Sequence, residues 1–163
     1  MVKHWRSRAG VEIAYAMIQG KSPTVVFLGG YHSDMTGTKA TFLNDWCCDQ
    51  GYAFLRFDYS GHGESSGDFE DGTLGCWITD ACNVIKATTT GPLILVGSSM
   101  GGWIMLHVAL KMKARVVGLL GIAAAPDFTR DLMYQELTVD QRNALQRDGE
   151  IVVESAYDEM GYV

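Results

Sequence analysis

The sequence has little proline, no long hydrophobic run and no excess of basic residues. It contains 3 Pro among 163 residues. Its longest apolar run, Val116 to Ala125, is too short to cross a bilayer and is interrupted by Gly118 and Gly121. The 13 basic and 19 acidic residues give a formal net charge of −6, which argues against binding to nucleic acid or an anionic membrane. The basic N-terminus is not followed by a continuous apolar stretch, so we expect no secretory signal and no transmembrane segment.

The cysteines are few and lack a metal-binding spacing. They are Cys47, Cys48, Cys76 and Cys82, with no C-x-x-C pair and no histidine nearby at ligand spacing. We therefore expect reduced, mostly buried thiols and a cytoplasmic protein, with a disulfide framework or a zinc site as the alternative. We expect neither a metal nor another cofactor.

Short apolar segments alternate with helical patterns along the chain, and its length fits one domain. Five segments are expected to be strands: Ile13–Met17, Val25–Leu28, Ala53–Phe57, Leu93–Val96 and Val116–Ile122. Three of the last four are nearly continuous apolar runs, which is typical of strands buried on both faces. Three helix patterns lie between them: Thr38–Gln50, Thr73–Lys86 and Met100–Met112. This order predicts an α/β fold with a mostly parallel sheet and helices on both faces.

The helix patterns also predict which side chains are buried. The first has one apolar stripe, formed by Phe42, Leu43, Trp46 and Cys47. The third is apolar almost all round, so we expect it to lie deep in the fold. After an irregular stretch from Asp127 to Leu137, Thr138 and Gln141 form a capping box that predicts a helix ending near Gly149.

The sharpest motif is Gly97-Ser98-Ser99-Met100-Gly101, which matches G-x-S-x-G between an apolar strand and an apolar helix. A serine nucleophile needs its hydroxyl lifted out of the sheet on a strained turn, and side chains at the two glycines would collide with neighbouring backbone. The alternative is a Gly/Ser turn without chemistry. The helix N-terminus also favours developing negative charge. The pattern predicts Ser99 as the catalytic nucleophile.

Such a nucleophile needs an oxyanion hole. One donor is expected to be the backbone N–H of Met100, the residue after the nucleophile. The segment Gly29-Gly30-Tyr31-His32 follows an apolar strand and resembles the glycine-rich oxyanion loops of lipases and esterases. We therefore expect the second donor to be the backbone N–H of Tyr31.

A third glycine-containing segment runs from Asp58 to Ser65. Its spacing, G-x-G-x-x-x-G with no helix pattern after it, does not fit a dinucleotide-binding loop. We interpret it as a structural turn in which Asp58 and Ser65 bond backbone N–H groups.

Four segments together resemble the α/β-hydrolase superfamily: FLGGYHSDMTGTKA, FDYSGHGESSG, TLGCW and VGSSMGGW. More narrowly, they are similar to the branch of mitochondrial palmitoyl-protein thioesterases and their bacterial relatives, from about Ala14 onward. The resemblance implies the same nucleophile and oxyanion hole and substrates that are acyl thioesters or esters, either small molecules or acylated proteins. It also implies a lid within residues 127–163, to which Leu132, Met133, Tyr134 and Leu137 would belong, and it leaves the mitochondrial matrix open as a location.

The sequence departs from the family in its histidines. Triad partners in this fold follow in the order Ser, Asp or Glu, then His. Only His107 follows Ser99, and eight residues of helical rise put it about 12 Å away, too far to be the base. His32 as an improvised base and Asp127 as a displaced acid are the alternatives.

We therefore expect a single hydrolase domain over residues 1–163 that is incomplete at its C-terminus. Little turnover is expected from this chain alone. The strand Val116–Ile122 should then form an apolar edge through which the chain self-associates. The competing hypothesis is a non-catalytic hydrolase-fold remnant that binds an acyl chain or a protein partner.

Overall fold

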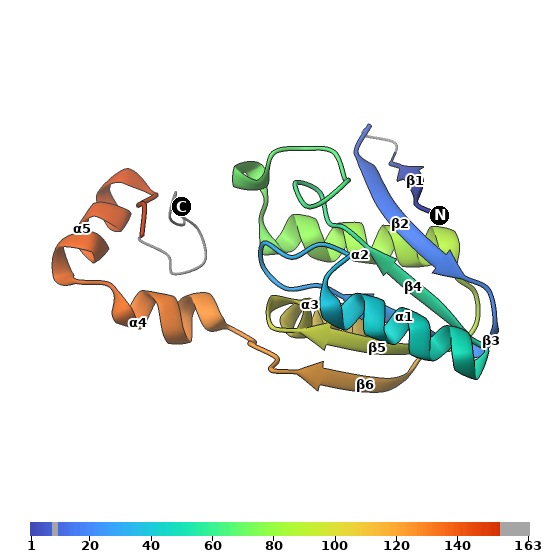
Figure 1. Ribbon diagram of the computed structural model, residues 1–163. Helices are drawn as coiled ribbons and strands as arrows, with labels where there is room; N and C mark the ends of the chain where they lie inside the picture. Colours follow the sequence, from blue (N-terminus) through green and yellow to red (C-terminus); the bar gives the residue numbers. More distant parts are fainter. Residues whose placement is uncertain (8–9, 154–163) are drawn as a thin grey trace. The chain divides into compact units, whose positions relative to one another are not determined.

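The computed structural model describes residues 1–7 and 10–153, which divide after Pro126 into two compact units. The first unit, Met1–Pro126, contains a six-stranded sheet in the order β1-β2-β4-β3-β5-β6 (Figure 1). Its strands are β1 (Lys3–Arg6), β2 (Glu12–Ile18), β3 (Lys21–Leu28), β4 (Tyr52–Phe57), β5 (Leu93–Ser98) and β6 (Val116–Ile122). The first three in spatial order pair antiparallel, and β4, β3, β5 and β6 run parallel. The predicted α/β class and mostly parallel sheet are confirmed.

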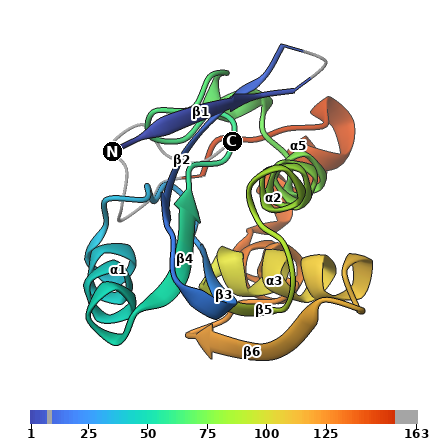
Figure 2. The same ribbon diagram turned by 90° about the vertical axis from the view of Figure 1, so that its right-hand side faces the viewer.

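Three helices connect the parallel strands. They are α1 (Thr38–Gln50), α2 (Leu74–Thr88) and α3 (Met100–Lys111). Figure 2 shows α1 on one side of the sheet and α2 with α3 on the other. On the α1 side, Val25, Phe27 and Phe54 pack against Ala40 and Cys47. Their neighbours along the strands point to the opposite face, where Val26, Leu28 and Leu55 are also buried.

Two predictions about helix burial are wrong. In α1, Phe42 and Trp46 are exposed, and Trp46 stacks instead on Tyr52 with ring centroids 5.9 Å apart. In α3, Leu106 and Leu110 are exposed, although Ile104 and the rest of one face are buried. Each helix covers the sheet with one face only, so the apolar residues on its other sides face outward.

The strand β1 was not predicted because its sequence, KHWR, has no apolar alternation. It is held by antiparallel pairing with β2, and an exposed ion pair joins Arg6 to Glu12 across the two strands at 2.6 Å. The strand β6 has only one neighbour, β5, and is the far edge of the sheet. Its Val117 and Leu119 are 64% and 47% exposed, which contradicts burial on both faces and agrees with the expected apolar edge.

The second unit begins at Asp127, and the elements described in it up to residue 153 are helical. It contains a π-helical turn, η2 (Thr129–Met133), a short helix, α4 (Tyr134–Glu136), and α5 (Val139–Asp148). The stretch expected to be irregular is therefore largely helical. The capping box is confirmed, since Thr138 accepts from the N–H of Gln141 and the Gln141 side chain accepts from the N–H of Thr138. The helix α5 ends at Gly149, as predicted.

All four cysteines are free thiols, with Cys47 and Cys82 buried and Cys48 and Cys76 exposed, so they are less buried than expected. Within residues 1–7 and 10–153, no group of side chains could hold a metal ion. None of the helices in that part of the chain is long and apolar enough to span a bilayer.

Candidate active site

Ser99 occupies a strained turn between β5 and α3. Its φ of 53° and ψ of −122° lie in a region that non-glycine residues rarely adopt, and its side chain is exposed. Three backbone hydrogen bonds hold this conformation: Ser99 donates to Ile122 at 3.1 Å, and its carbonyl accepts from Gly102 at 2.8 Å and Ala125 at 3.1 Å. Backbone strain of this kind persists only where the surroundings enforce it, and it is concentrated at functional sites.

The two glycines of the motif allow the turn to form. A Cβ at Gly97 would lie 2.5 Å from the carbonyl oxygen of Gly101. A Cβ at Gly101 would lie 2.1 Å from the carbonyl oxygen of Leu28. Neither neighbour is a side chain that could move aside, so any larger residue would have to displace backbone at the turn. This agrees with the steric reason for which the sequence motif was singled out.

The loop after β3, residues 29–37, passes directly beside Ser99. A Cβ placed on Gly30 would lie 3.3 Å from the Ser99 Cβ and 3.4 Å from the Ser98 carbonyl oxygen. Tyr31 follows Gly30 in this loop, and Met100 is the first residue of α3, where a backbone N–H has no partner within the helix. The structure thus brings the loop of Tyr31 and the N-terminus of α3 to the same serine.

An aromatic cluster packs against this loop. The Tyr31 ring lies 4.9 Å from the ring of Phe69 and 6.2 Å from that of Trp77. His32, with a φ of 52°, places its ring 3.8 Å from that of Phe69. His62 is buried at the centre of the cluster, with its ring 5.0 Å from Phe69 and 5.1 Å from Trp77. No periodic pattern in the sequence predicts this cluster, because its members come from three separate segments.

Two further candidates, His107 and Asp127, contact residues close to them in the sequence. His107 is half-buried on α3 with its ring 6.5 Å from that of Trp103. Asp127 places its carboxylate 3.7 Å from Arg130 in an exposed ion pair within the second unit. The assignment of Ser99, Tyr31 and Met100 therefore remains a prediction from the motif and the local geometry.

Residues 20–151 match the protein family described as Serine aminopeptidase, S33. The chain belongs to this α/β-hydrolase family. It is 43% identical over 149 residues to the human mitochondrial palmitoyl-protein thioesterase ABHD10, a match that covers 91% of this chain and 48% of that protein. The chain thus spans about half the length of the curated relatives it matches. The resemblance stated from the sequence motifs is confirmed.

Two solved structures show the same architecture. Mouse α/β-hydrolase domain-containing protein 10 superposes with a TM-score of 0.89 at 37% identity, covering 99% of this chain and 64% of that structure. An esterase from Exiguobacterium antarcticum superposes with a TM-score of 0.72 at 28% identity, covering 91% of this chain and 55% of that structure. The α/β-hydrolase fold expected from the sequence is therefore shown.

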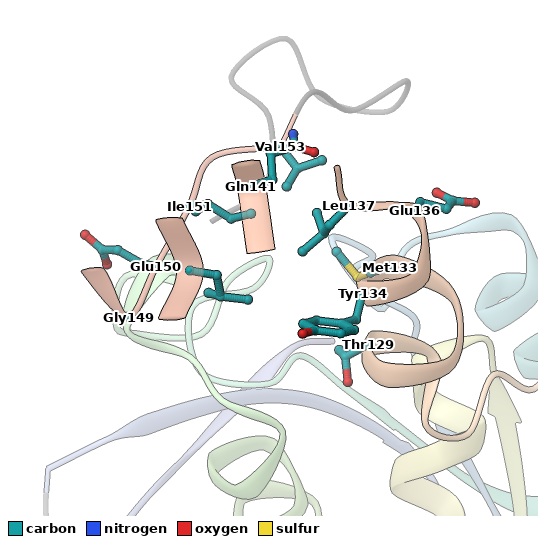
Figure 3. Close-up of a pocket in the computed structure, with 11 residues that line it drawn as sticks. Thr129, Met133, Tyr134, Glu136, Leu137, Gln141, Gly149, Glu150, Ile151 and Val153 are labelled. Atoms are coloured by element: carbon teal, nitrogen blue, oxygen red, sulfur yellow. The ribbon is translucent and has the colours of Figure 1, made fainter. Parts of the chain in front are cut away.

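The second unit of the chain contains a pocket of its own, with a volume of about 620 Å³ (Figure 3). Such a volume suits a small ligand. Of the four residues that the resemblance placed in a lid, Met133, Tyr134 and Leu137 line it, whereas Leu132 is exposed and does not. Leu145, Ile151 and Val153 add further apolar lining. Figure 3 shows the carboxylates of Glu136 and Glu150 pointing away from the pocket interior.

The segment from Asp58 to Ser65 is the structural turn that the sequence predicted. The Asp58 carboxylate accepts from the N–H of Glu64 at 2.9 Å, and the Ser65 hydroxyl oxygen accepts from the N–H of Ala14 at 2.9 Å. The sequence analysis missed a further bond, from the N–H of Met35 to Asp58 at 2.6 Å. The signal for it was the position of Asp58 directly after a parallel strand, at the sheet edge where the loop after β3 also begins.

Proposed function

We propose that this chain provides the nucleophile and oxyanion hole of a serine hydrolase that acts on acyl thioesters or carboxylic esters. The strained, exposed Ser99 beside a glycine-rich loop is the observation that supports the proposal most strongly. The Ser99 hydroxyl attacks the acyl carbonyl carbon, and the resulting oxyanion accepts hydrogen bonds from the N–H groups of Tyr31 and Met100. The C–S or C–O bond then breaks, the thiol or alcohol leaves, and water hydrolyses the acyl-enzyme.

The proposed substrate class follows from the relatives rather than from the geometry. ABHD10 is named a palmitoyl-protein thioesterase, and the pocket formed by Met133, Tyr134 and Leu137 offers an apolar surface to a long acyl chain. We propose that residues 127–163 act as a lid that binds this chain. The free thiols support a reducing compartment, which we propose to be the cytoplasm or the mitochondrial matrix. Recovery of the protein from an oxidising compartment with paired cysteines would refute that location.

The proposal predicts slow turnover by this chain. The Ser99 proton must pass to a base, and His107 lies on the same helix about 12 Å along its axis. In a serine protease without a complete triad, the oxyanion hole and binding alone leave about 10³–10⁴-fold catalysis over water. We therefore expect a small but measurable rate above the uncatalysed reaction.

The proposal is tested by the hydrolysis of a palmitoyl thioester, measured as the release of free thiol. We expect Ser99→Ala to form no acyl-enzyme and to hydrolyse the thioester more slowly than wild type, keeping at most the part of the rate that the oxyanion hole and binding supply by themselves. The matched control is Ser98→Ala, which changes the neighbouring serine on β5 but leaves the Ser99 hydroxyl in place, and should therefore retain most of the wild-type rate. Equal rates for wild type and Ser99→Ala would refute the assignment.

The second candidate function is binding without catalysis. It is favoured by the position of His107 and by the pocket in the second unit, whose apolar lining needs no reacting group. A non-hydrolysable palmitoyl thioether separates the two functions. A chain that binds this thioether tightly, while hydrolysing the thioester no faster than Ser99→Ala does, is a binding protein rather than a hydrolase.

A further inference from the structure

The loop that contains Tyr31 is attached to the sheet by side chains from the end of β4. Met35, in the same loop, is 2% exposed, and its N–H donates to Oδ1 of Asp58 at 2.6 Å. Its carbonyl oxygen accepts from Nη1 of Arg56 at 2.7 Å. Both backbone polar groups of this buried residue are therefore satisfied by side chains from one neighbouring strand end.

A third bond attaches the other end of the loop. The Tyr59 hydroxyl donates to the carbonyl oxygen of Gly29 at 3.3 Å. Gly29 precedes Tyr31 and Met35 follows it, so side chains of residues 56–59 hold the loop on both sides of the proposed oxyanion donor. The bonds within the loop are local, such as those from the N–H of Ser33 to Gly30 and from the N–H of Thr36 to Asp34, and they do not reach the sheet.

Asp58 is itself fixed on all sides. It is 2% exposed, and its Oδ2 accepts from the N–H of Glu64. A Cβ at Gly63 would lie 2.2 Å from Oδ2, so the following turn closes tightly around the carboxylate. Its backbone N–H donates to Ala14, and its carbonyl accepts from the Ser65 hydroxyl. The carboxylate therefore has little freedom to move, and its bond to the Met35 N–H holds Met35 in a fixed position relative to the sheet.

Burying a carboxylate at position 58 is energetically unfavourable. Burial raises the pKa of the Asp58 carboxyl, and the charges of Asp34 and Glu64 act in the same direction, while the N–H bonds from Glu64 and Met35 oppose the shift. Hydrogen bonds to an ionised acceptor are about twice as strong as neutral ones and more demanding in direction. An ionised Asp58 thus holds Met35 more firmly than a neutral side chain of the same shape would.

We propose that Asp58 is a positioning residue of the hydrolase: with Arg56, it holds the loop through Met35 so that the backbone of Tyr31 stays beside Ser99. This inference rests on the proposed function. Asp58 then has two roles: it stabilises the turn at residues 58–65 through Glu64, and it supports the oxyanion hole through Met35.

The test compares Asp58→Asn with wild type in two measurements. Hydrogen exchange of the backbone amides in residues 29–37 reports on the loop, and the rate of fluorophosphonate reaction at Ser99 reports on the oxyanion hole. The Asn amide has one acceptor oxygen, so it cannot accept from both Met35 and Glu64 as the carboxylate does. We expect exchange at Met35 to become about tenfold faster and the maximal reaction rate about tenfold slower, the size expected when a charge-assisted bond becomes neutral or is lost. The probe's half-saturating concentration should change little, because the oxyanion forms only in the transition state.

Asp80→Asn is the matched control. Asp80 is also a buried carboxylate, and its Oδ2 accepts from the N–H and the hydroxyl of Ser60. It makes no hydrogen bond to residues 29–37 within the described part of the chain. We expect faster exchange at Ser60 in this variant and wild-type exchange in residues 29–37.

Arg56→Met provides a second test in case Asp58→Asn does not fold. It removes the donor to the Met35 carbonyl and should also slow the reaction of Ser99, whereas Arg56→Lys keeps a cationic donor and should restore much of the rate. Unchanged loop exchange and an unchanged reaction rate in Asp58→Asn, or in Arg56→Met if only that variant folds, would overturn the proposal. If wild type itself does not react, the proposed function fails and the oxyanion role with it, while the exchange data still decide whether Asp58 holds the loop.

Discussion

Ser99 combines a left-handed backbone with an exposed side chain at the first turn of a helix. A non-glycine residue in such a conformation costs about 1–3 kcal/mol, which the rest of the structure must supply. Here the hydrogen bond from the Ser99 N–H to Ile122 and those from Gly102 and Ala125 to the Ser99 carbonyl hold it, and Gly97 and Gly101 leave the space that it needs. These features are what a nucleophile on a strand–helix turn requires, and the G-x-S-x-G motif predicted them from five residues.

His62 was harder to predict. Its sequence context, Ser60-Gly61-His62-Gly63, indicates a turn, and turns are usually exposed. In the structure its ring is buried between Phe69, Trp77 and Tyr59, because the chain after β4 folds back over α2. Local sequence contains no information on which distant rings will cover such a side chain.

The burial of His62 predicts that stability falls at acidic pH. Burial lowers the pKa of this histidine, and the charge of His32 adds to the effect, while the bond from Nδ1 to the Ser60 carbonyl oxygen opposes it. Protonation therefore favours the unfolded chain, in which the pKa keeps its ordinary value near 6.5. The contribution of neutral His62 to stability is complete above that pH and is lost as the pH falls toward the lowered pKa of the folded state.

Urea unfolding at about pH 7.5 and about pH 5 measures this effect. We expect wild type to lose more free energy of unfolding between the two conditions than His62→Asn does, because Asn has an amide donor for Ser60 but does not titrate. Other titrating groups are common to both proteins and cancel in the comparison. An equal loss in the two proteins would show that His62 does not titrate as a buried residue.

The parallel strands and the three long helices were predictable because their apolar runs and stripes are intrinsic to each segment. β3, β4, β5 and β6 each contain a run of apolar residues, and α1 is followed by Gly51, whose left-handed conformation with φ 71° is typical of a glycine after a helix. The strand β1 could not be predicted, since Lys3–Arg6 becomes a strand only by pairing with β2. The exposure of Phe42 and Trp46 depends on how α1 meets the sheet, which a stripe on one helix does not determine.

The edge strand β6 gives a prediction about association. Val117 and Leu119 lie on the same face of the strand and are exposed, and the strand's outer backbone groups face no further strand within the described residues. Such an edge favours pairing with another chain. We expect wild type to self-associate at micromolar concentration in sedimentation velocity, and Val117→Lys to shift the distribution toward monomer, because a charge at an edge opposes strand pairing.

Leu132→Lys is the control for that experiment. Leu132 is as apolar and about as exposed as Val117, but it lies in η2 of the second unit rather than at a sheet edge. It should leave the association unchanged. A monomeric wild type, or an equal effect of both substitutions, would contradict the role of β6.

The fold as a whole explains why residues distant in sequence meet at one place. The carboxyl ends of β3, β4 and β5 lie at the same edge of the sheet, so the loop of Tyr31, the turn of Asp58 and Ser99 all begin there. Membership of the α/β-hydrolase family could be read from the motifs, and the family match over residues 20–151 confirms it. The position of Asp58 at the end of a parallel strand could also be read, but its bond to Met35 could not, because that bond depends on the three-dimensional course of two loops.

The most direct test of the central claim is the reaction of the whole chain with a fluorophosphonate, followed by mass spectrometry of its peptides. The account predicts a single adduct on the hydroxyl of Ser99, which disappears in Ser99→Ala and persists in Ser98→Ala. An adduct on another serine, or no adduct on the wild-type chain under conditions that label an intact serine hydrolase, would contradict it.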